Sequence, residues 1–239
     1  MCELLGMECN VETDIAFSFA GLRQRGGRTA HHGDGWGLAL YEGKAARVFL
    51  EPIAAAQSPL AKFVSDNPVK TLLAIGHIRK RTVGPITLAN THPFVRELWG
   101  RHFVFAHNGN LKNSRALKLG RFKPIGTTDS ERAYCHLLEA LRTSFSDYPK
   151  RPSELWQAIA DVSKKIGLYA RCATNLCYIV RKAPFGKARL ADEDVVIDFS
   201  AVTTPKDRVV IVSTVPLTTN ETWTHGEPGN MWVFDGGAL

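Results

Sequence analysis

The stretch MCELLG, residues 1–6, places a cysteine second in the chain, directly before an apolar run. Leu4 and Leu5 predict a buried strand over residues 3–8. Chain ends usually fray, so a thiol at this position suggests a function only if the terminus itself is anchored. Methionine aminopeptidase removes Met1 when the second side chain is small, and Cys2 qualifies, so we expect a mature chain that begins with cysteine.

A terminal cysteine would carry a thiol and a free α-amine on one residue. The amine has a pKa of roughly 7.7–8 and can take a proton near neutral pH, whereas the thiol reacts as the thiolate and has an ordinary pKa of about 8.5. The amine, directly or through a water molecule, is therefore a base for its own thiol. A cysteine at position two is also compatible with an ordinary thiol, so the catalytic hypothesis depends on motifs elsewhere.

The composition predicts a folded chain of one large domain or two small ones. Of the 239 residues, 44% are hydrophobic and 22% are charged, which is enough to build a sizeable core. No apolar run approaches the roughly 18 residues of a membrane span, and no basic segment precedes an apolar one at the N-terminus as in a signal peptide. We therefore expect a cytoplasmic protein without a membrane partner.

The cysteines and the net charge each leave two interpretations open. An odd number of cysteines in a chain expected to be cytosolic favours free thiols over a disulfide framework; the five are Cys2, Cys9, Cys135, Cys172 and Cys177. The net charge of +7 is compatible with nucleic-acid binding. The basic residues are mostly scattered, however, and no RNP, zinc-finger or helix-turn-helix pattern is present, so we expect a basic surface and no nucleic-acid partner.

Hydrophobic periodicity predicts helices and strands in blocks. Helices are expected over residues 14–22, 58–66, 127–145 and 153–166, the third with a capping box formed by Thr128 and Glu131. A hairpin is expected over residues 36–50, and a strand is expected from residue 101 to a turn at Asn108-Gly109. Further strands are expected over residues 3–8, 71–78, 168–173, 176–182, 195–201, 208–214 and 231–235. Residues 82–101 are expected to be irregular. This pattern favours a mixed or antiparallel sheet over a strict βαβ repeat.

Three internal motifs carry polar groups suited to chemistry. In AHNGNL, residues 106–111, a turn would expose the Asn108 amide and the Gly109 N–H, which can stabilise an oxyanion; a plain hairpin turn is the alternative. In GHIRKRTVG, residues 76–84, the Arg79 guanidinium suits a carboxylate or a surface salt bridge. In GTTDSE, residues 126–131, Asp129 either stabilises a helix N-terminus or binds an ammonium group. An Arg and an Asp held apart would bind both ends of an α-amino acid.

We expect no metal and no cofactor. The nearest candidates for a metal site are His31, His32 and Asp34 in a glycine-rich loop and the pair Cys172 and Cys177. The first group matches no metal-binding motif, and the second lacks two further ligands at suitable spacing. Three histidines adjoin the motifs, namely His77, His92 and His107. We expect them to support the site structurally instead of performing chemistry.

Taken together and in this order, Cys2, GHIRKRTVG, HNG at residues 107–109 and TDSE at residues 128–131 resemble the motifs of the class-II glutamine amidotransferases, which are N-terminal-nucleophile hydrolases. RGGRTAHHGDGWGLALY, residues 25–41, resembles the Arg-Gly and Asp-Gly hairpin segment of that family. THPF at residues 91–94, RELWG at residues 96–100 and APFG at residues 183–186 resemble the stand-alone bacterial YafJ-type branch. The resemblance thus covers nearly the whole chain.

The resemblance implies an α+β fold, a four-layer αββα sandwich of two mainly antiparallel sheets, with residues 1–239 forming one domain. It also implies the site: Cys2 as nucleophile with its freed α-amine as base, Asn108 and Gly109 as oxyanion hole, Arg79 on the substrate α-carboxylate, Asp129 on its α-ammonium, and Thr82 beside the glutamine. The substrate would be glutamine or a γ-glutamyl compound. A separate synthase could receive the ammonia.

Two departures from the family pattern leave other functions open. Lys80 and Val83 stand where many members have an aromatic residue and a histidine, and the stretch over residues 165–171 is short. A catalytically silent binding module on the same fold is one alternative, and retention of Met1 would favour it. A basic nucleic-acid binder is the other.

Overall fold

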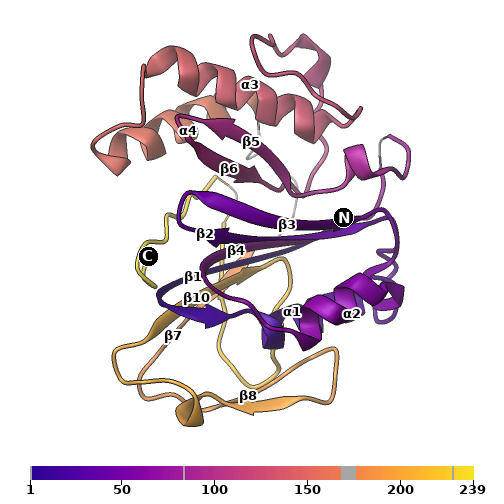
Figure 1. Cartoon of the computed structure of the whole chain (residues 1–239), viewed down its shortest axis with the longest axis vertical. Coiled ribbons are helices and arrows are strands. Elements are labelled where there is room, and N and C mark those ends of the chain that lie inside the picture. Colours follow the sequence, from indigo (N-terminus) through magenta and orange to yellow (C-terminus); the bar gives the residue numbers. More distant parts are fainter. Residues whose placement is uncertain (1, 83, 168–175, 228) are drawn as a thin grey trace.

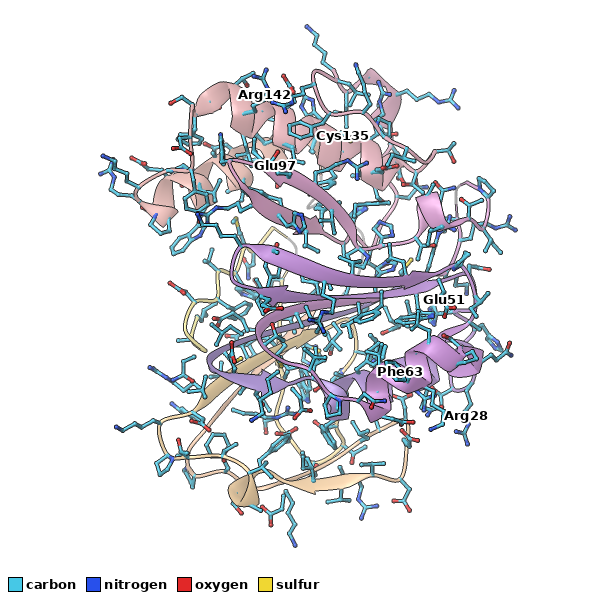
Figure 2. All side chains as sticks on the ribbon, viewed as in Figure 1. Arg28, Glu51, Phe63, Glu97, Cys135 and Arg142 are labelled. Atoms are coloured by element: carbon cyan, nitrogen blue, oxygen red, sulfur yellow. The ribbon has the colours of Figure 1, made fainter. Side chains whose placement is uncertain are left out.

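The computed structural model describes residues 2–82, 84–167, 176–227 and 229–239. Four layers follow one another in Figure 1: helices α1 and α2, a seven-stranded sheet, the β5–β6 sheet, and helices α3 and α4. The expected αββα sandwich is therefore confirmed. In the described part of the chain, the second sheet has two strands, and β8 and β9 form a further small sheet of their own. Phe63 on α2 and Arg142 on α3 mark the two outer layers in Figure 2.

The element bounds set the frame for the site. The α-helices are α1 Ala16–Arg25, α2 Pro59–Asp66, α3 Asp129–Ser144 and α4 Pro152–Ile166. The strands are β1 Glu3–Asp14, β2 Trp36–Glu42, β3 Ala45–Glu51, β4 Lys70–Ile78, β5 Phe94–Leu98, β6 Arg101–Phe105, β7 Cys177–Lys182, β8 Lys187–Arg189, β9 Val196–Asp198, β10 Arg208–Ser213 and β11 Thr224–His225. Short 3-10 turns lie at Ala55–Gln57, Leu88–Asn90, Ser114–Ala116 and Phe199–Ala201.

The first strand lies inside the large sheet, whose order is β11-β7-β10-β1-β4-β2-β3. Antiparallel pairing aligns Leu5 with Ser213 of β10, and Glu3 with Ile78 of β4. A strand with partners on both sides resists the fraying that is usual at a chain end. The start of the chain is therefore held within the sheet, as the apolar residues after Cys2 predict.

The two faces of β1 serve different layers. Leu5, Met7 and Cys9 are almost fully buried and belong to the core that also holds Phe19 and Leu22 of α1. Side chains alternate between the faces of a strand, so Leu4 and the preceding Cys2 belong to the opposite face, which looks toward β5 and β6. A second core joins β5 to α3 and α4 through residues such as Phe94, Tyr134, Leu138 and Leu155.

Most of the expected elements are confirmed. The hairpin forms β2 and β3, and Gly43 in its turn has a positive φ of 60°, a conformation that glycine adopts readily. The Thr128 hydroxyl accepts a hydrogen bond from the Glu131 N–H, as an N-cap should. The Glu131 carboxylate does not complete the capping box. It instead accepts hydrogen bonds from the Ile125 and Gly126 N–H groups.

Three expectations about strands are wrong or fall outside the described residues. Residues 82–101 contain β5, which pairs with β6; its polar Arg96 and Glu97 hid the strand pattern. Residues 231–235 do not form a strand in the described structure. Trp232 and Phe234 pack their rings on Tyr178 instead, and side-chain packing replaces a ladder there. The expected strand at 168–173 and Cys172 lie outside the described residues, as do Met1 and Val83.

A glycine in β2 permits the close approach of the segment before β5. A Cβ at Gly37 would lie 2.3 Å from the backbone oxygen of His92 and 2.9 Å from Pro93 Cδ. We expect Gly37→Ala to lower the free energy of unfolding by roughly 1–3 kcal/mol, because a backbone oxygen cannot swing aside as a flexible side chain can. Urea titration at equilibrium measures this change.

Gly6→Ala in β1 is the matched control. A Cβ at Gly6 would contact Val212 Cβ at 3.5 Å, which is ordinary van der Waals contact. We expect a change of less than about 1 kcal/mol. Equal losses in the two variants would contradict the steric explanation.

Candidate active site

The site forms where the first strand begins and β4 ends. Because Glu3 pairs with Ile78 in antiparallel register, the residue before Glu3 lies opposite the residue after Ile78. This register brings Cys2 beside Arg79 and Lys80. The Cys2 Sγ atom lies 3.3 Å from the Lys80 nitrogen, which donates to it, and 3.5 Å from the Lys80 carbonyl oxygen.

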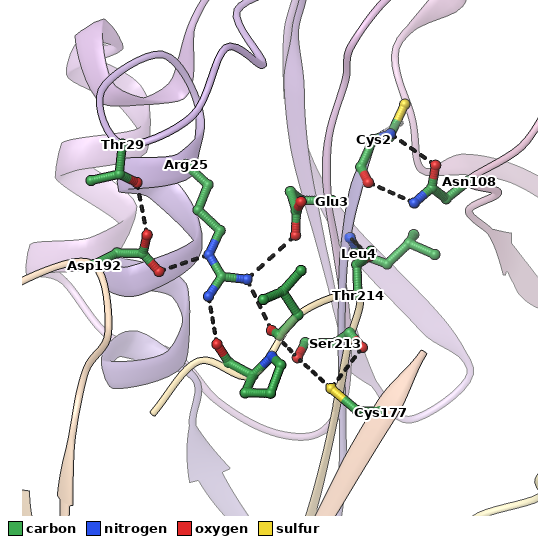
Figure 3. Close-up of polar contacts among 12 residues, drawn as sticks. Cys2, Glu3, Leu4, Arg25, Thr29, Asn108, Cys177, Asp192, Ser213 and Thr214 are labelled. Carbon is green, nitrogen blue, oxygen red and sulfur yellow. Dashed lines mark hydrogen bonds and ion pairs between the residues drawn. The ribbon is translucent and has the colours of Figure 1, made fainter. Parts of the chain in front are cut away.

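Asn108 reaches Cys2 from the second sheet. The main-chain nitrogen of Cys2 donates to Asn108 Oδ1 at 2.8 Å, and Asn108 Nδ2 donates to the Cys2 carbonyl oxygen at 2.6 Å. Figure 3 shows both bonds closing on the main chain of Cys2. Asn108 follows β6 after two residues, and its side chain is buried. The two inner layers of the sandwich therefore meet at the first residues of the chain.

The surroundings of the thiol act on its pKa in opposite directions. Burial raises the pKa of Cys2, while the Lys80 N–H and the positive charge of Arg79 lower it and the charge of Glu3 raises it. The net direction is upward. A thiol in this state is mostly protonated near neutral pH, so a nucleophilic role would need a local base.

Arg79 is fixed at the end of β4 by its main chain and its side chain. Its N–H donates to the Gly35 carbonyl at 2.7 Å, its carbonyl accepts from the Asp34 N–H at 3.1 Å, and its Nη1 donates to the Pro85 carbonyl at 3.0 Å. Asp34 also accepts from the Arg81 N–H at 2.7 Å. The guanidinium is buried beside Cys2 and contributes charge to it. The glycine-rich loop thus positions a cation at the thiol.

Asp129 stands in the first turn of α3, where the unpaired N–H groups and the helix dipole favour a carboxylate. Its Oδ2 accepts from the Leu111 N–H at 2.6 Å, and its Oδ1 accepts from the Ser130 N–H at 2.9 Å. The first bond ties the loop after Asn108 to the helix. His107 adds a contact between its Nδ1 and Ser130 Oγ at 2.9 Å.

Gly109 and Thr82 complete the set of expected site residues. A Cβ at Gly109 would lie 2.8 Å from His107 Nε2, so the loop passes too close to that ring for a side chain. No return strand follows Asn108-Gly109 in the described loop, and the plain hairpin alternative is therefore not observed. Thr82 is exposed, three residues beyond Arg79. The structure thus gathers Cys2, Arg79 and Asn108 directly, with Asp129 joined through the 107–111 loop.

One supporting residue, Asn90, was not apparent from the sequence. Its Oδ1 accepts from the Thr127 N–H at 2.7 Å, and its Nδ2 donates to the Pro85 carbonyl at 3.0 Å. Asn90 therefore links the loop after Arg79 to the segment that leads into Asp129. The partner lies 37 residues away in the chain, and no local pattern predicts such a bond.

The three histidines beside the motifs are uncharged in this setting. The rings of His77 and His92 are buried and pack with centroids 4.3 Å apart. Burial lowers the pKa of His77 to about 3 and that of His92 well below its usual value, and it also lowers the pKa of His107. Neutral rings fit the structural role expected for them.

The described residues offer neither a cluster of metal ligands nor a membrane-spanning helix. Within residues 2–82, 84–167, 176–227 and 229–239, no group of three His, Cys, Asp or Glu side chains is placed to hold a metal ion. In the same ranges, no helix has the length and apolarity needed to cross a membrane. The described cysteines, Cys2, Cys9, Cys135 and Cys177, are free thiols.

Comparison with known proteins agrees with this fold. A family model described as class-II glutamine amidotransferases matches residues 1–239. The chain belongs to the class-II glutamine amidotransferases, enzymes of glutamine amide transfer. It is 48% identical to YafJ of Escherichia coli (strain K12), named as a glutamine amidotransferase, over 248 residues that cover 98% of this chain and 97% of YafJ.

Further relatives support the same family. A protein of Haemophilus influenzae Rd, also named as a glutamine amidotransferase, is 46% identical and is covered over 85% of its length. The 2.0 Å crystal structure of a predicted glutamine amidotransferase from Pseudomonas aeruginosa PA01 superposes with a TM-score of 0.76 at 41% identity, covering 99% of this chain and 98% of that one. The Bacillus subtilis glutamine PRPP amidotransferase, at 17% identity and a TM-score of 0.52, covers 89% of this chain and 42% of its own and shows the fold alone.

The charge of Arg79 predicts a pH effect on the Cys2 thiol. Because the guanidinium lowers the pKa of Cys2, Arg79→Gln should raise it and move the pH midpoint of Cys2 alkylation upward from that of the parent protein. Arg79→Lys keeps the charge and should stay nearer the parent value. Peptide mass spectrometry after iodoacetamide treatment over a pH series measures the midpoint. A downward shift of the alkylation midpoint in Arg79→Gln would contradict this effect of the Arg79 charge.

Proposed function

We propose that the protein hydrolyses the γ-amide of glutamine or of a γ-glutamyl compound, with Cys2 as the nucleophile. The observation that carries the proposal is the pair of hydrogen bonds between the Cys2 main chain and the Asn108 amide. These bonds hold the main-chain nitrogen and carbonyl group of Cys2, while the Lys80 N–H donates to its thiol. Removal of Met1 would turn that nitrogen into the α-amine that serves as base.

The chemistry would proceed in two halves. The amine accepts the thiol proton, and the thiolate attacks the side-chain carbonyl carbon of the substrate to form a tetrahedral intermediate. The carbon–nitrogen bond then breaks, the α-ammonium returns its proton to the leaving nitrogen, and a γ-glutamyl thioester remains on Cys2. Water attacks the thioester and releases glutamate and the thiol. With free glutamine the leaving group is ammonia.

The oxyanion of both intermediates would lie against Asn108 and Gly109. A primary amide has two N–H bonds, so the one that Asn108 donates to the Cys2 carbonyl leaves a second for the oxyanion. The Gly109 N–H would supply another donor. Donors fixed in place before the reaction stabilise developing charge without reorganisation.

Recognition of the amino-acid end would use opposite charges, one at the end of β4 in the large sheet and one at the start of α3 in the outer helix layer. Arg79 would bind the α-carboxylate, since a guanidinium matches a carboxylate in two parallel hydrogen bonds. Asp129 would bind the α-ammonium from the start of α3. Thr82, on the exposed loop after Arg79, would lie beside the bound glutamine. Lys80 stands where an aromatic lid residue is common, so closure over the substrate would differ here.

Partner, domain and location complete the proposal. Residues 1–239 would form one amidotransferase domain, and ammonia would pass either to water or to a separate synthase. The protein would act in the cytoplasm, where its free thiols stay reduced. A catalytically silent module is the alternative from another class, and it predicts that the protein binds glutamine without turnover.

The nucleophile can be tested by covalent trapping. A glutamine-mimicking electrophile should label Cys2 alone in protein whose intact mass shows the loss of Met1, and Cys2→Ala should abolish both labelling and glutaminase turnover. Cys9→Ala is a matched control, since Cys9 is buried on the opposite face of β1. Labelling elsewhere, or full activity in Cys2→Ala, would overturn the assignment. Turnover on glutamine and on γ-glutamyl dipeptides, measured side by side, identifies the substrate.

Asn108→Asp tests the oxyanion role separately. The aspartate keeps an oxygen that can accept from the Cys2 nitrogen but loses the N–H donors. We expect kcat to fall by roughly 10²–10³ with little change in KM, as for loss of one oxyanion donor. Asn67→Asp makes the same chemical change at the exposed C-cap of α2, in the opposite helix layer, and should leave kcat unaltered. A loss confined to KM would assign Asn108 to substrate binding instead.

A further inference from the structure

Arg25, at the C-terminal end of α1, joins four parts of the chain on the face of β1 opposite to Asn108. Its Nε donates to Asp192 Oδ2 at 2.7 Å, and its Nη1 donates to Glu3 Oε2 at 3.3 Å. The same guanidinium donates to the carbonyl oxygens of Val215 at 2.9 Å and Pro216 at 2.6 Å. Figure 3 shows Glu3 directed toward this guanidinium, while Cys2 is held by Asn108.

The Arg25–Glu3 pair is buried. Arg25 is 5% exposed and Glu3 is 7% exposed. A buried carboxylate is strongly unfavourable without a partner, whereas a paired one with further hydrogen bonds is tolerated. The only ion pair that the described residues give to Glu3 is the one with Arg25. The Glu3 side chain, directly after Cys2, is therefore held toward Arg25.

The other contacts at the start of β1 are on the main chain. The Leu4 N–H donates to Thr214 Oγ1 at 2.8 Å, and the Thr214 N–H donates to the Leu4 carbonyl at 3.3 Å. Regular pairing with β10 begins only at Leu5. Between Leu5 and the chain end, the Glu3 side chain is thus the anchor that reaches α1 and the segment after β10.

We propose that Arg25 is a positioning residue for the Cys2 nucleophile, which it holds through its ion pair with Glu3; this inference rests on the proposed function. Asn108 bonds Cys2 from the side of the second sheet, and Arg25 bonds Glu3 from the helix layer. Adjacent residues of a strand project to opposite faces, so the two contacts act from opposite sides and fix the end of the strand against rotation and displacement. Arg25 does not touch the thiol itself.

The charges of Arg25 and Glu3 also affect the pKa of the Cys2 thiol. This effect distinguishes a positioning role of Arg25 from a contribution to stability alone. The charged groups that act on the Cys2 thiol are the N-terminal ammonium group, Arg79 at the end of β4 and Glu3 on β1, together with the Lys80 N–H. The charge of Glu3 raises the pKa of Cys2, and Arg25 is its counter-charge. Removing the charge of Glu3 should therefore lower the pKa of the Cys2 thiol, and removing the charge of Arg25 should raise it.

The experiment compares Glu3→Gln, Arg25→Gln and the double variant with the parent protein. Cys2 alkylation by iodoacetamide is followed by peptide mass spectrometry across a pH series. We expect the midpoint to shift down in Glu3→Gln and up in Arg25→Gln, each by roughly half a pH unit, and to return toward the parent value in the double variant. Asp192→Asn is the matched control, because Asp192 bonds the Nε atom of Arg25 and its loss leaves the Nη1 contact with Glu3 in place; the pH midpoint of Cys2 alkylation should stay at the parent value in this variant.

The outcomes distinguish the inference from its alternatives. Shifts in the same direction, or no shift, in the two single variants would overturn it, since a general loss of packing has no reason to give opposite signs. If Arg25→Gln does not fold, Glu3→Gln and the double variant still test the direction in which the alkylation midpoint shifts. Where glutaminase activity is present, Arg25→Gln should lower kcat by roughly 10-fold or more without raising KM. Absence of that activity would refute the proposed function. The alkylation midpoints would still decide whether Arg25 and Glu3 act on the Cys2 thiol.

Discussion

The structure depends on the antiparallel pairing of the start of β1 with the end of β4. This register makes the first residues of the chain part of an inner strand and sets Cys2 opposite Arg79. A chain end normally keeps its conformational freedom and loses any fixed geometry. Here the sheet removes that freedom, so a terminal residue can take part in chemistry that requires a defined distance to its partners.

The two faces of one strand explain how that residue is held. Asn108 contacts the main chain of Cys2 from the second sheet, and Arg25 contacts the side chain of Glu3 from the helix layer. The first contact fixes the main chain of Cys2, and the second provides a buried counter-charge for Glu3. The αββα architecture is well suited to this arrangement because an inner strand has a different layer on each side. A two-layer fold would leave one face of the strand in water.

Local motifs indicated several features that the structure shows around Cys2, whereas two features of the surrounding fold have no such local signal. Cys2, the strand before Arg79, the Asn108-Gly109 loop and the Thr128 cap were all recognisable from local motifs. The strand β5 was missed because Arg96 and Glu97 interrupt its apolar pattern, and the Arg96 guanidinium instead forms an ion pair with Glu131 of α3. Residues 231–235 look like a strand because Trp232 and Phe234 alternate, yet their rings pack on β7 without joining its ladder.

By itself, the sequence determined the chemical groups and their order along the chain, because these follow from side-chain type and motif spacing; the layered class of fold was implied by the resemblance of those motifs to a known family. Only the tertiary structure decided which groups meet. The bond between Asn108 and Cys2 spans 106 positions, and that between Arg25 and Asp192 spans 167. Such contacts depend on strand register and on the stacking of layers, which the global packing of the chain sets and which no local stretch encodes.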